Sequence, residues 1–167
     1  MQEYEAQGGA LIMFEKGREA AESVWPFYEE ALANKVGSPV QLVPCTDGEF
    51  SDRIEFQVRT NDVRLLLITS FSLSKMPGTL WLYSHGAYVC EPWRKNGVGT
   101  LMNEFRQHIA LEAGAWGLLA FVRGDNEPQR KLLENRGWKR AQVFWATDYT
   151  QELWAYQVIT NFGRKLK

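Results

Sequence analysis

The strongest chemical signal in the sequence is a glycine-rich stretch between a predicted strand and a predicted helix, Val89-Cys90-Glu91-Pro92-Trp93-Arg94-Lys95-Asn96-Gly97-Val98-Gly99-Thr100. Backbone N–H groups at the start of a helix have no partner inside the helix, and the helix dipole adds partial positive charge there. Gly97 and Gly99 allow close approach to the backbone, and Arg94 and Lys95 add charge at the rim. The stretch predicts an anion site suited to a pyrophosphate, although a helix start whose glycines serve only packing is equally consistent with it.

Two other phosphate-binding loops do not fit this sequence. A Walker loop requires Gly-x-x-x-x-Gly-Lys-Ser/Thr, which is absent. A dinucleotide-binding fold requires a third glycine and a parallel βαβ pattern from its first strand. The glycine-rich stretch must therefore belong to a different arrangement of elements.

The first half of the chain predicts a helix followed by a run of antiparallel strands. Apolar residues predict a short strand at 10–14 and a helix from about Gly17 to Asn34, interrupted or kinked near Pro26; the following stretch to about Phe50 reads as loop. The alternation of Ile54, Phe56 and Val58 is typical of a half-buried strand. Turn residues then separate two more predicted strands, at 63–74 and 80–90.

The second half alternates helices and strands. Helical spacing of apolar residues predicts a helix from 101 to Gly114, and the apolar run 116–122 is typical of a strand covered on both faces. Asn126 is a predicted N-cap, with Gln129 placed for a capping box and Gly137 ending the helix. Two closing strands are predicted at 139–147 and 153–162.

Two motifs in this order resemble the GNAT superfamily of N-acetyltransferases. Arg94, Gly97 and Gly99 occupy the positions of its motif A, and the segment from Asn126 to Trp138 is similar to its motif B. The resemblance covers roughly residues 80–144. It implies a single α/β (mixed α+β) domain over residues 1–167. Its one mixed sheet would have an antiparallel meander followed by a parallel β-α-β pair, with helices on both faces.

The resemblance also implies a binding site for acetyl-CoA as co-substrate, without a metal. In the family the strand before the loop splays from its parallel neighbour, and pantetheine lies in the gap. Carried over, pantetheine would contact Ala87, Tyr88, Val89 and Cys90. The pyrophosphate would contact Arg94, Lys95, Asn96, Gly97, Val98, Gly99 and Thr100. Asn126 would lie near the thiol, or would act only as a helix cap.

The resemblance suggests how catalysis would be divided among the residues. A backbone N–H of Val89 or Cys90 would polarise the thioester carbonyl. His85 is the candidate general base, since imidazole titrates near neutrality; an exposed, inert turn residue is the alternative. Leu133 stands where the family usually has a tyrosine as general acid. Tyr88, Tyr149 and Tyr156 are candidate substitutes.

Composition restricts the partners. The net charge is −1, from 19 basic and 20 acidic side chains, which argues against a dedicated nucleic-acid binder. The two cysteines are in no metal or redox spacing, and no apolar stretch reaches the length of a membrane span. We expect a cytoplasmic protein. The aromatic-rich end is compatible with a homodimer.

Three functions are consistent with these features. The leading one is transfer of an acetyl group from acetyl-CoA to a primary amine by direct attack. The second is a CoA-binding or assembly protein without turnover, which the missing tyrosine keeps open. The third is modification of a macromolecule, such as a protein terminus or a tRNA or DNA base.

Overall fold

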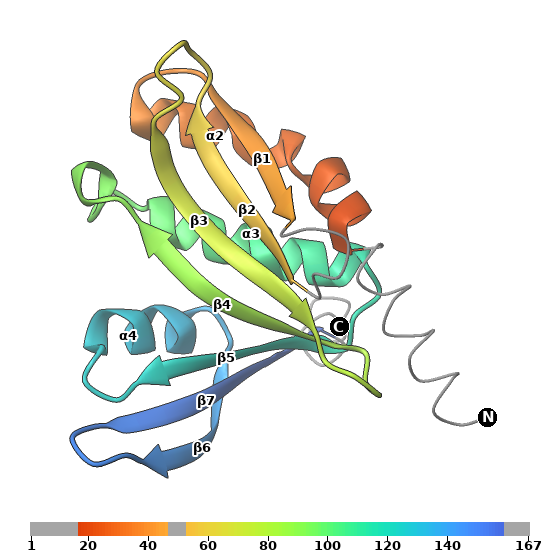
Figure 1. The fold of residues 1–167 in the computed structure, drawn as a ribbon, viewed down its shortest axis with the longest axis vertical. Coiled ribbons are helices and arrows are strands. Elements are labelled where there is room, and N and C mark those ends of the chain that lie inside the picture. The colour runs from red at the N-terminus through yellow and green to blue at the C-terminus, as the bar shows by residue number, and fades with distance from the viewer. Residues whose placement is uncertain (1–16, 47–52, 159–167) are drawn as a thin grey trace.

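The computed structural model describes residues 17–46 and 53–158, which form one mixed sheet and the helices that cover it (Figure 1). The predicted strand at 10–14 lies outside these residues. Residues 17–24 are helical. The elements that follow are α2 (Pro26–Val36), β1 (Val40–Thr46), β2 (Arg53–Thr60), β3 (Leu67–Lys75), β4 (Trp81–Val89), α3 (Val98–Glu112), β5 (Gly117–Arg123), α4 (Glu127–Asn135), β6 (Lys139–Trp145) and β7 (Thr150–Gln157).

The seven strands are ordered β1-β2-β3-β4-β5-β7-β6. Strands β1 to β4 form an antiparallel meander, β4 and β5 are parallel, and β7 pairs antiparallel with both β5 and β6. The predicted sheet, an antiparallel meander followed by a parallel β-α-β pair, is confirmed. Helix α3 supplies the connection that parallel neighbours require.

The first edge strand is a correction to the predicted loop between Gly37 and Phe50. Residues 40–46 form β1, which pairs with β2 from Val40↔Thr60 to Thr46↔Ile54. Pro44 by itself favours a turn over a strand, yet a proline without an N–H is tolerated on an edge strand. The strand predicted from Val63 also begins later, at Leu67, because Leu65 has φ of 48° and Val63 is fully exposed.

The helix interruption predicted near Pro26 is confirmed. The helix of residues 17–24 is separated from α2 by a turn at Trp25, since Pro26 has no N–H to continue the ladder. Helix α2 ends at Gly37, whose φ of 82° places it in the left-handed region that favours glycine. Lys35, in the last turn of α2, contacts the glycine-rich loop.

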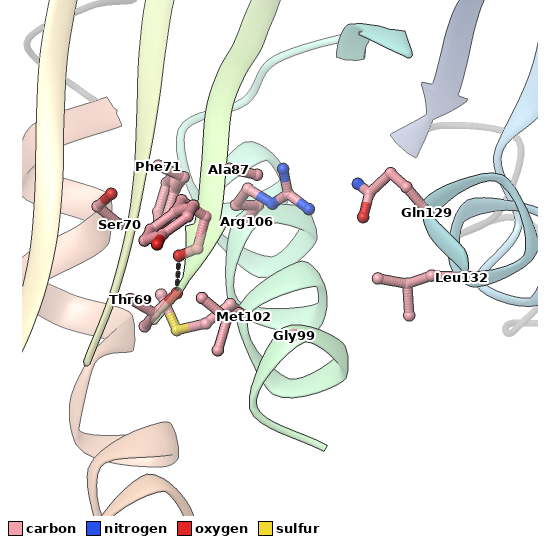
Figure 2. A pocket seen from close by; sticks show the side chains of 11 residues that line it. Thr69, Ser70, Phe71, Ala87, Gly99, Met102, Arg106, Gln129 and Leu132 are labelled. Atoms are coloured by element: carbon pink, nitrogen blue, oxygen red, sulfur yellow. Dashed lines mark hydrogen bonds between the residues drawn. The ribbon is translucent and has the colours of Figure 1, made fainter. Parts of the chain in front are cut away.

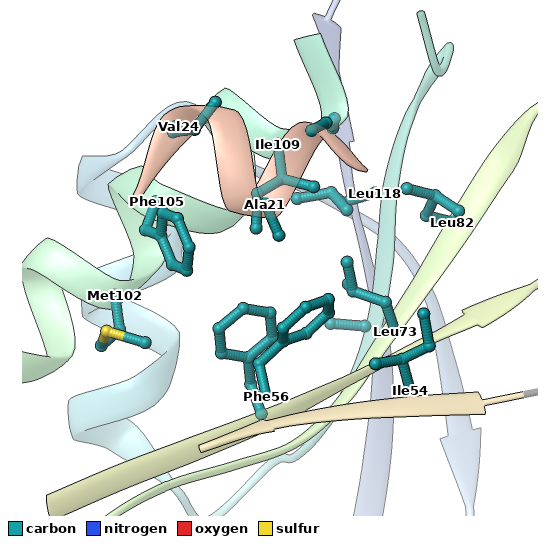
Figure 3. Close-up of a cluster of buried hydrophobic side chains, with 14 of the residues drawn as sticks. Ala21, Val24, Ile54, Phe56, Leu73, Leu82, Met102, Phe105, Ile109 and Leu118 are labelled. Atoms are coloured by element: carbon teal, nitrogen blue, oxygen red, sulfur yellow. The ribbon is translucent and has the colours of Figure 1, made fainter. Parts of the chain in front are cut away.

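The core lies between the sheet and α3, and is built around aromatic rings. Phe56 and Phe71 stack with centroids 5.3 Å apart, and Phe71 meets Phe105 of α3 edge-on at 5.9 Å. Figure 3 shows Ala21 and Ile109 closing the same cluster from the helical side. All of these side chains are essentially buried.

The contacts of the described helices reach one face of the sheet, where the prediction had helices on both. On β5, Leu118 and Ala120 are buried on this face, while Phe121 on the other face is 43% exposed. The run 116–122 is therefore covered on one face rather than two. The opposite face of β2 carries Glu55 and Gln57, whose polar side chains need no cover.

A buried carboxylate joins the last three elements. Glu152 of β7 accepts hydrogen bonds from Arg130 of α4 at 2.8 Å, from Arg140 of β6 at 3.1 Å and from the Trp154 indole at 3.1 Å. Burial raises the pKa of Glu152, but the hydrogen bonds from Trp154, Arg130 and Arg140 outweigh it, so the pKa lies below its ordinary value. The carboxylate is thus ionised in the folded protein at neutral pH.

Glu152→Gln is expected to lower the free energy of unfolding at pH 7 by about 2 kcal/mol. This is less than the usual cost of breaking a buried ion pair, because both arginines are partly exposed and solvent screens the interaction. Because the folded-state pKa is depressed, this stabilisation is present above the ordinary pKa of 4.5 and is lost as pH falls through the folded-state pKa. Urea unfolding at pH 7 and at pH 3 measures both effects. A difference between wild type and variant that does not shrink in acid would contradict the assignment.

Candidate functional site

A gap opens in the middle of the sheet between β4 and β5. The two strands pair only from Trp81↔Gly117 to Tyr83↔Leu119. Beyond Tyr83, β4 continues to Val89 while β5 diverges from it (Figure 1). The edge of β4 from Ser84 onward therefore faces the gap without a strand partner, which is the splayed geometry that the resemblance implies.

A bulge in β4 lies beside this gap. The β3–β4 register shifts between Ser70↔Tyr88 and Ser72↔His85, so β4 holds one extra residue there. Gly86 takes up the bulge with φ of 64°, a conformation that suits glycine. The bulge changes the direction of the strand just before Ala87 to Val89.

The glycine-rich loop presents a row of unpaired backbone donors at the mouth of the gap. After a 3-10 turn at Glu91–Trp93, the chain passes through Lys95 with φ of 64° and Gly97 with φ of 91°. The first N–H of α3 with an acceptor is that of Leu101, which donates to Gly97 O. Within the described residues, the N–H groups of residues 95–100 donate no short, well-aligned backbone hydrogen bond, and only weak turn contacts span residues 94–97. Successive free N–H groups at a helix start form an anion-binding concavity.

The end of α2 fixes this loop through two reciprocal hydrogen bonds. The Lys35 ammonium donates to Asn96 O at 2.9 Å, and the Asn96 side-chain amide donates to Lys35 O at 3.1 Å. A Cβ on Gly97 would lie 2.9 Å from Lys35 Nζ. Lys35 therefore adds a positive charge against the loop. Sequence reasoning missed it because 61 residues separate it from Asn96.

Arg94 lies back along the end of β4. Its Nε donates to Val89 O at 2.7 Å, and its guanidinium lies 5.2 Å from the centroid of the Tyr88 ring. Both Arg94 and Lys95 are exposed at the rim. The predicted basic rim is therefore present, with Arg94 held against the strand that lines the gap.

A small cavity of about 100 Å³ lies beside the free edge of β4, between the sheet and helices α3 and α4 (Figure 2). It is lined by residues of four elements, namely Thr69, Ser70, Phe71, Ala87, Tyr88, Val89, Gly99, Met102, Arg106, Gln129 and Leu132. Four predicted residues, Ala87, Tyr88, Val89 and Gly99, meet there. The other predicted cofactor residues lie outside its lining: Cys90, Arg94, Lys95, Asn96, Gly97, Val98, Thr100 and Asn126.

The two backbone donors proposed to polarise a carbonyl differ. The Cys90 N–H donates to Ile68 O of the neighbouring segment at 2.9 Å, so Cys90 is not free to polarise a substrate, which corrects that assignment. Because N–H directions alternate along a strand, the N–H of Val89 points away from β3 and toward the gap. Of the two residues, Val89 alone keeps a donor for the role.

His85 lies on the face of β4 opposite to α3. Its Nε2 is 2.7 Å from Ser74 Oγ, and its ring stacks on Tyr83 with centroids 4.7 Å apart and planes inclined by 8°. Tyr83 in turn meets Phe121 of β5 at 5.7 Å. The histidine is therefore an oriented, partly buried side chain next to the point where β4 and β5 separate, and it does not line the cavity.

Helix α4 turns different residues to the cavity than expected. Asn126 is the N-cap as predicted, its side chain accepting the Gln129 N–H at 3.4 Å, while Gln129 and Leu132 line the cavity. Leu133, at the position of the family's usual tyrosine, is fully buried. Of the three candidate tyrosines only Tyr88 lines the cavity.

Two further properties concern the described residues alone. They contain no group of three or more His, Cys, Asp or Glu side chains arranged to hold a metal ion. None of their helices is both long and apolar enough to traverse a bilayer.

The fold is that of the GNAT N-acetyltransferases. The chain superposes on the ribosomal-protein-S18-alanine N-acetyltransferase from Escherichia coli with a TM-score of 0.56 at 16% identity, covering 66% of this chain and 72% of that one. A second match is a GNAT family acetyltransferase from Elizabethkingia anophelis, described with acetyl-CoA bound. Its TM-score is 0.57 at 11% identity, and the match covers 71% of this chain and 97% of that one. The chain also superposes on nourseothricin acetyltransferase with a TM-score of 0.55 at 15% identity, covering 72% of this chain and 85% of that one.

These similarities are structural. No protein-family model matches the sequence, and no curated protein matches it by sequence. The fold is thus established at identities too low to carry over an acceptor or a set of catalytic residues.

Proposed function

We propose that this protein is an acetyl-CoA-dependent N-acetyltransferase that acts on a primary amine by direct attack. The observation that carries the proposal is the run of N–H groups at residues 95–100 that donate no short, well-aligned backbone hydrogen bond, at the mouth of the gap between β4 and β5. The fold is shared with acetyltransferases, including one described with acetyl-CoA bound. An anion site at one end of an open strand edge suits a ligand with a pyrophosphate and a long amide-containing arm.

In this proposal the loop holds the pyrophosphate and the gap holds the pantetheine arm. The N–H groups of residues 95–100 bind phosphate oxygens, with Lys35, Arg94 and Lys95 supplying charge around them. The amides of the arm pair with the edge of β4 that faces the gap beyond Tyr83. A cavity of about 100 Å³ suits a narrow chain and a small acyl group.

The transfer step requires few catalytic groups. The amine nitrogen forms a bond to the thioester carbonyl carbon, the C–S bond breaks, and CoA leaves as the thiolate. The N–H of Val89 stabilises the negative charge that develops on the carbonyl oxygen. His85 takes the proton that the amine loses, directly or through a water. With Leu133 buried, α4 offers no tyrosine to protonate the thiolate.

The acceptor would enter from the face that carries His85 and Tyr83. That face is not covered by the described helices, and Phe121 and Phe144 expose 43% and 46% of their surface on it. The two rings lie 6.0 Å apart, beside Tyr83. Such a surface favours an acceptor with an apolar or aromatic portion next to its amine.

The test combines calorimetry with an assay of thiol release. We expect acetyl-CoA to bind the purified full chain with micromolar affinity, and CoA to be released when a panel of primary amines, including aryl-alkylamines and polyamines, is added. Failure of the folded protein to bind acetyl-CoA would overturn the cofactor site. Binding without release for any amine or peptide amine would instead support the CoA-binding protein without turnover.

Lys35→Met is expected to weaken acetyl-CoA binding about tenfold, because it removes a charge-assisted hydrogen bond that holds the loop and a positive charge beside it. The thermal midpoint should change little, since the side chain is on the surface. Calorimetry measures the affinity. Lys131→Met, which removes an exposed ammonium paired with Glu127 at 3.0 Å on α4, is the matched control. Equal affinities of the two variants would contradict a role for Lys35.

A further inference from the structure

Helix α3 carries an arginine into the interior without a counter-ion. Arg106 is 3% exposed. No carboxylate of the described residues lies within 4.0 Å of its guanidinium, in contrast to Arg130 and Arg140, which share Glu152. Buried charges in proteins are ordinarily paired or neutralised. An unpaired buried guanidinium therefore requires an explanation.

The hydrogen bonds of Arg106 leave part of its guanidinium unused. Nη1 donates to Ser84 Oγ at 2.9 Å and Nη2 to Asn103 Oδ1 at 3.4 Å, whereas the buried Nε has no acceptor. A guanidinium has five N–H donors. The Phe71 ring, 5.8 Å from the guanidinium carbon, gives some compensation. Desolvation lowers the pKa of Arg106 to about 10, so the side chain is still a cation at neutral pH.

The guanidinium of Arg106 faces the space that the proposed ligand would occupy. It lines the cavity, and Figure 2 shows its guanidinium directed across the gap toward Gln129 of α4. Its partner Ser84 directly follows Tyr83, the last β4 residue paired with β5. Arg106 thus lies at the closed end of the gap, two helical turns beyond the loop, where the acyl end of the ligand would lie.

We propose that Arg106 binds a carboxylate at the closed end of the gap, so that the reacting pair includes an acidic group. This inference rests on the proposed function. The carboxylate could be the distal one of a short dicarboxylic acyl group on CoA, or that of an acceptor that is itself an amino acid. Either one would supply the planar acceptor that an arginine fork binds with two parallel hydrogen bonds.

The same site does not suit the phosphates of CoA. The N–H groups of residues 95–100 already provide for an anion at the start of α3. The cavity has room for a small group, and Thr69, Ser70 and Gln129 add polar side chains to its lining. An ordinary acetyl methyl would leave the guanidinium unpaired against an apolar group, which is unfavourable.

The experiment compares donors and acceptors in the wild type and in Arg106→Met. The first arm measures the affinities of CoA, acetyl-CoA and succinyl-CoA by calorimetry. The second arm measures thiol release from acetyl-CoA with L-amino acids and with their α-amides. We expect a preference of about tenfold for the carboxylate-bearing compound in one arm, which falls to within about twofold in Arg106→Met.

The two arms identify the source of the carboxylate. Preference for succinyl-CoA indicates the acyl group, and preference for amino acids over amides indicates the acceptor. Absence of both preferences, or preferences that survive in Arg106→Met, would overturn the inference about Arg106. If the wild type still binds CoA in that case, the proposed function stands. If CoA itself does not bind the wild type, the proposed function fails and this inference with it.

Two further variants keep the measurement interpretable. Arg64→Met removes an exposed arginine that pairs with Asp62 at 2.8 Å, far along the chain from the gap, and should leave both preferences unchanged. Arg106→Lys keeps the charge but loses the fork, and should retain a preference of about threefold. If Arg106→Met does not fold, Arg106→Lys takes its place. Its preference for the carboxylate-bearing compound is then compared with that of Arg64→Met, and a smaller preference supports the inference.

Discussion

Replacing Gly99 by glutamate is expected to weaken acetyl-CoA binding more than a hundredfold, about 2.7 kcal/mol. Gly99 is in the first turn of α3, where the N–H groups of residues 98–100 donate no short, well-aligned backbone hydrogen bond. A carboxylate placed there would itself take these donors and would repel a pyrophosphate. Calorimetry with acetyl-CoA measures the loss.

The local geometry allows a clean control for this variant. A Cβ at Gly99 would meet only Val89 Cγ2, at 3.8 Å, and its φ is not positive, so Gly99→Ala should fold and bind within a fewfold of wild type. Gly97 would be a poor choice, because its φ of 91° and the proximity of Lys35 make any side chain there strained. Similar affinities for the alanine and glutamate variants would contradict the anion site.

Removal of the His85 imidazole is expected to lower kcat about a hundredfold, the lower end of what a general base contributes. In His85→Ala the affinity for acetyl-CoA should be unchanged, because His85 is outside the cavity lining and on the opposite face of β4. The measurement is steady-state thiol release with the best amine from the panel, alongside calorimetry with acetyl-CoA.

The chain offers a second histidine as the matched control. His108 of α3 contacts Tyr28 at 3.4 Å and Glu112 at 3.7 Å, away from the gap. His108→Ala should retain kcat. Ser74→Ala, which removes the hydroxyl 2.7 Å from His85 Nε2, should show an intermediate loss if that contact orients the ring. A His85→Ala enzyme with wild-type kcat would exclude the base.

Local patterns predicted the elements that carry the site, because those patterns act over short distances. The glycine-rich loop, α3 and the Asn126 cap follow from residues within a few positions of each other. Strand β1 was missed because its pairing with β2 is decided across the chain and outweighs the local signal of Pro44. The start of β3 was misplaced because Leu65 adopts a positive φ that its sequence does not announce.

The residues that give the candidate site its particular character were harder to find. Lys35 reaches the loop from a helix 61 residues away, and no local signal marks it. Arg106 did have a signal: with Met102, Phe105 and Ile109 it lies on the apolar face of α3, at spacings of three and four residues. A charged residue within such a stripe indicates either a buried partner or a ligand.

The short ladder between β4 and β5 gives the sheet an edge in its interior. Beyond Tyr83, β4 has no strand partner among the described residues on this side, as in the outermost strand of any sheet. A peripheral edge of this kind is open to other chains and invites aggregation. Here Met102 and Arg106 of α3 and Leu132 of α4 line the opening, and the strands close at Tyr83. The backbone groups of β4 therefore stay accessible to an extended small molecule, while the surrounding side chains and helices prevent a strand of another protein from pairing with them.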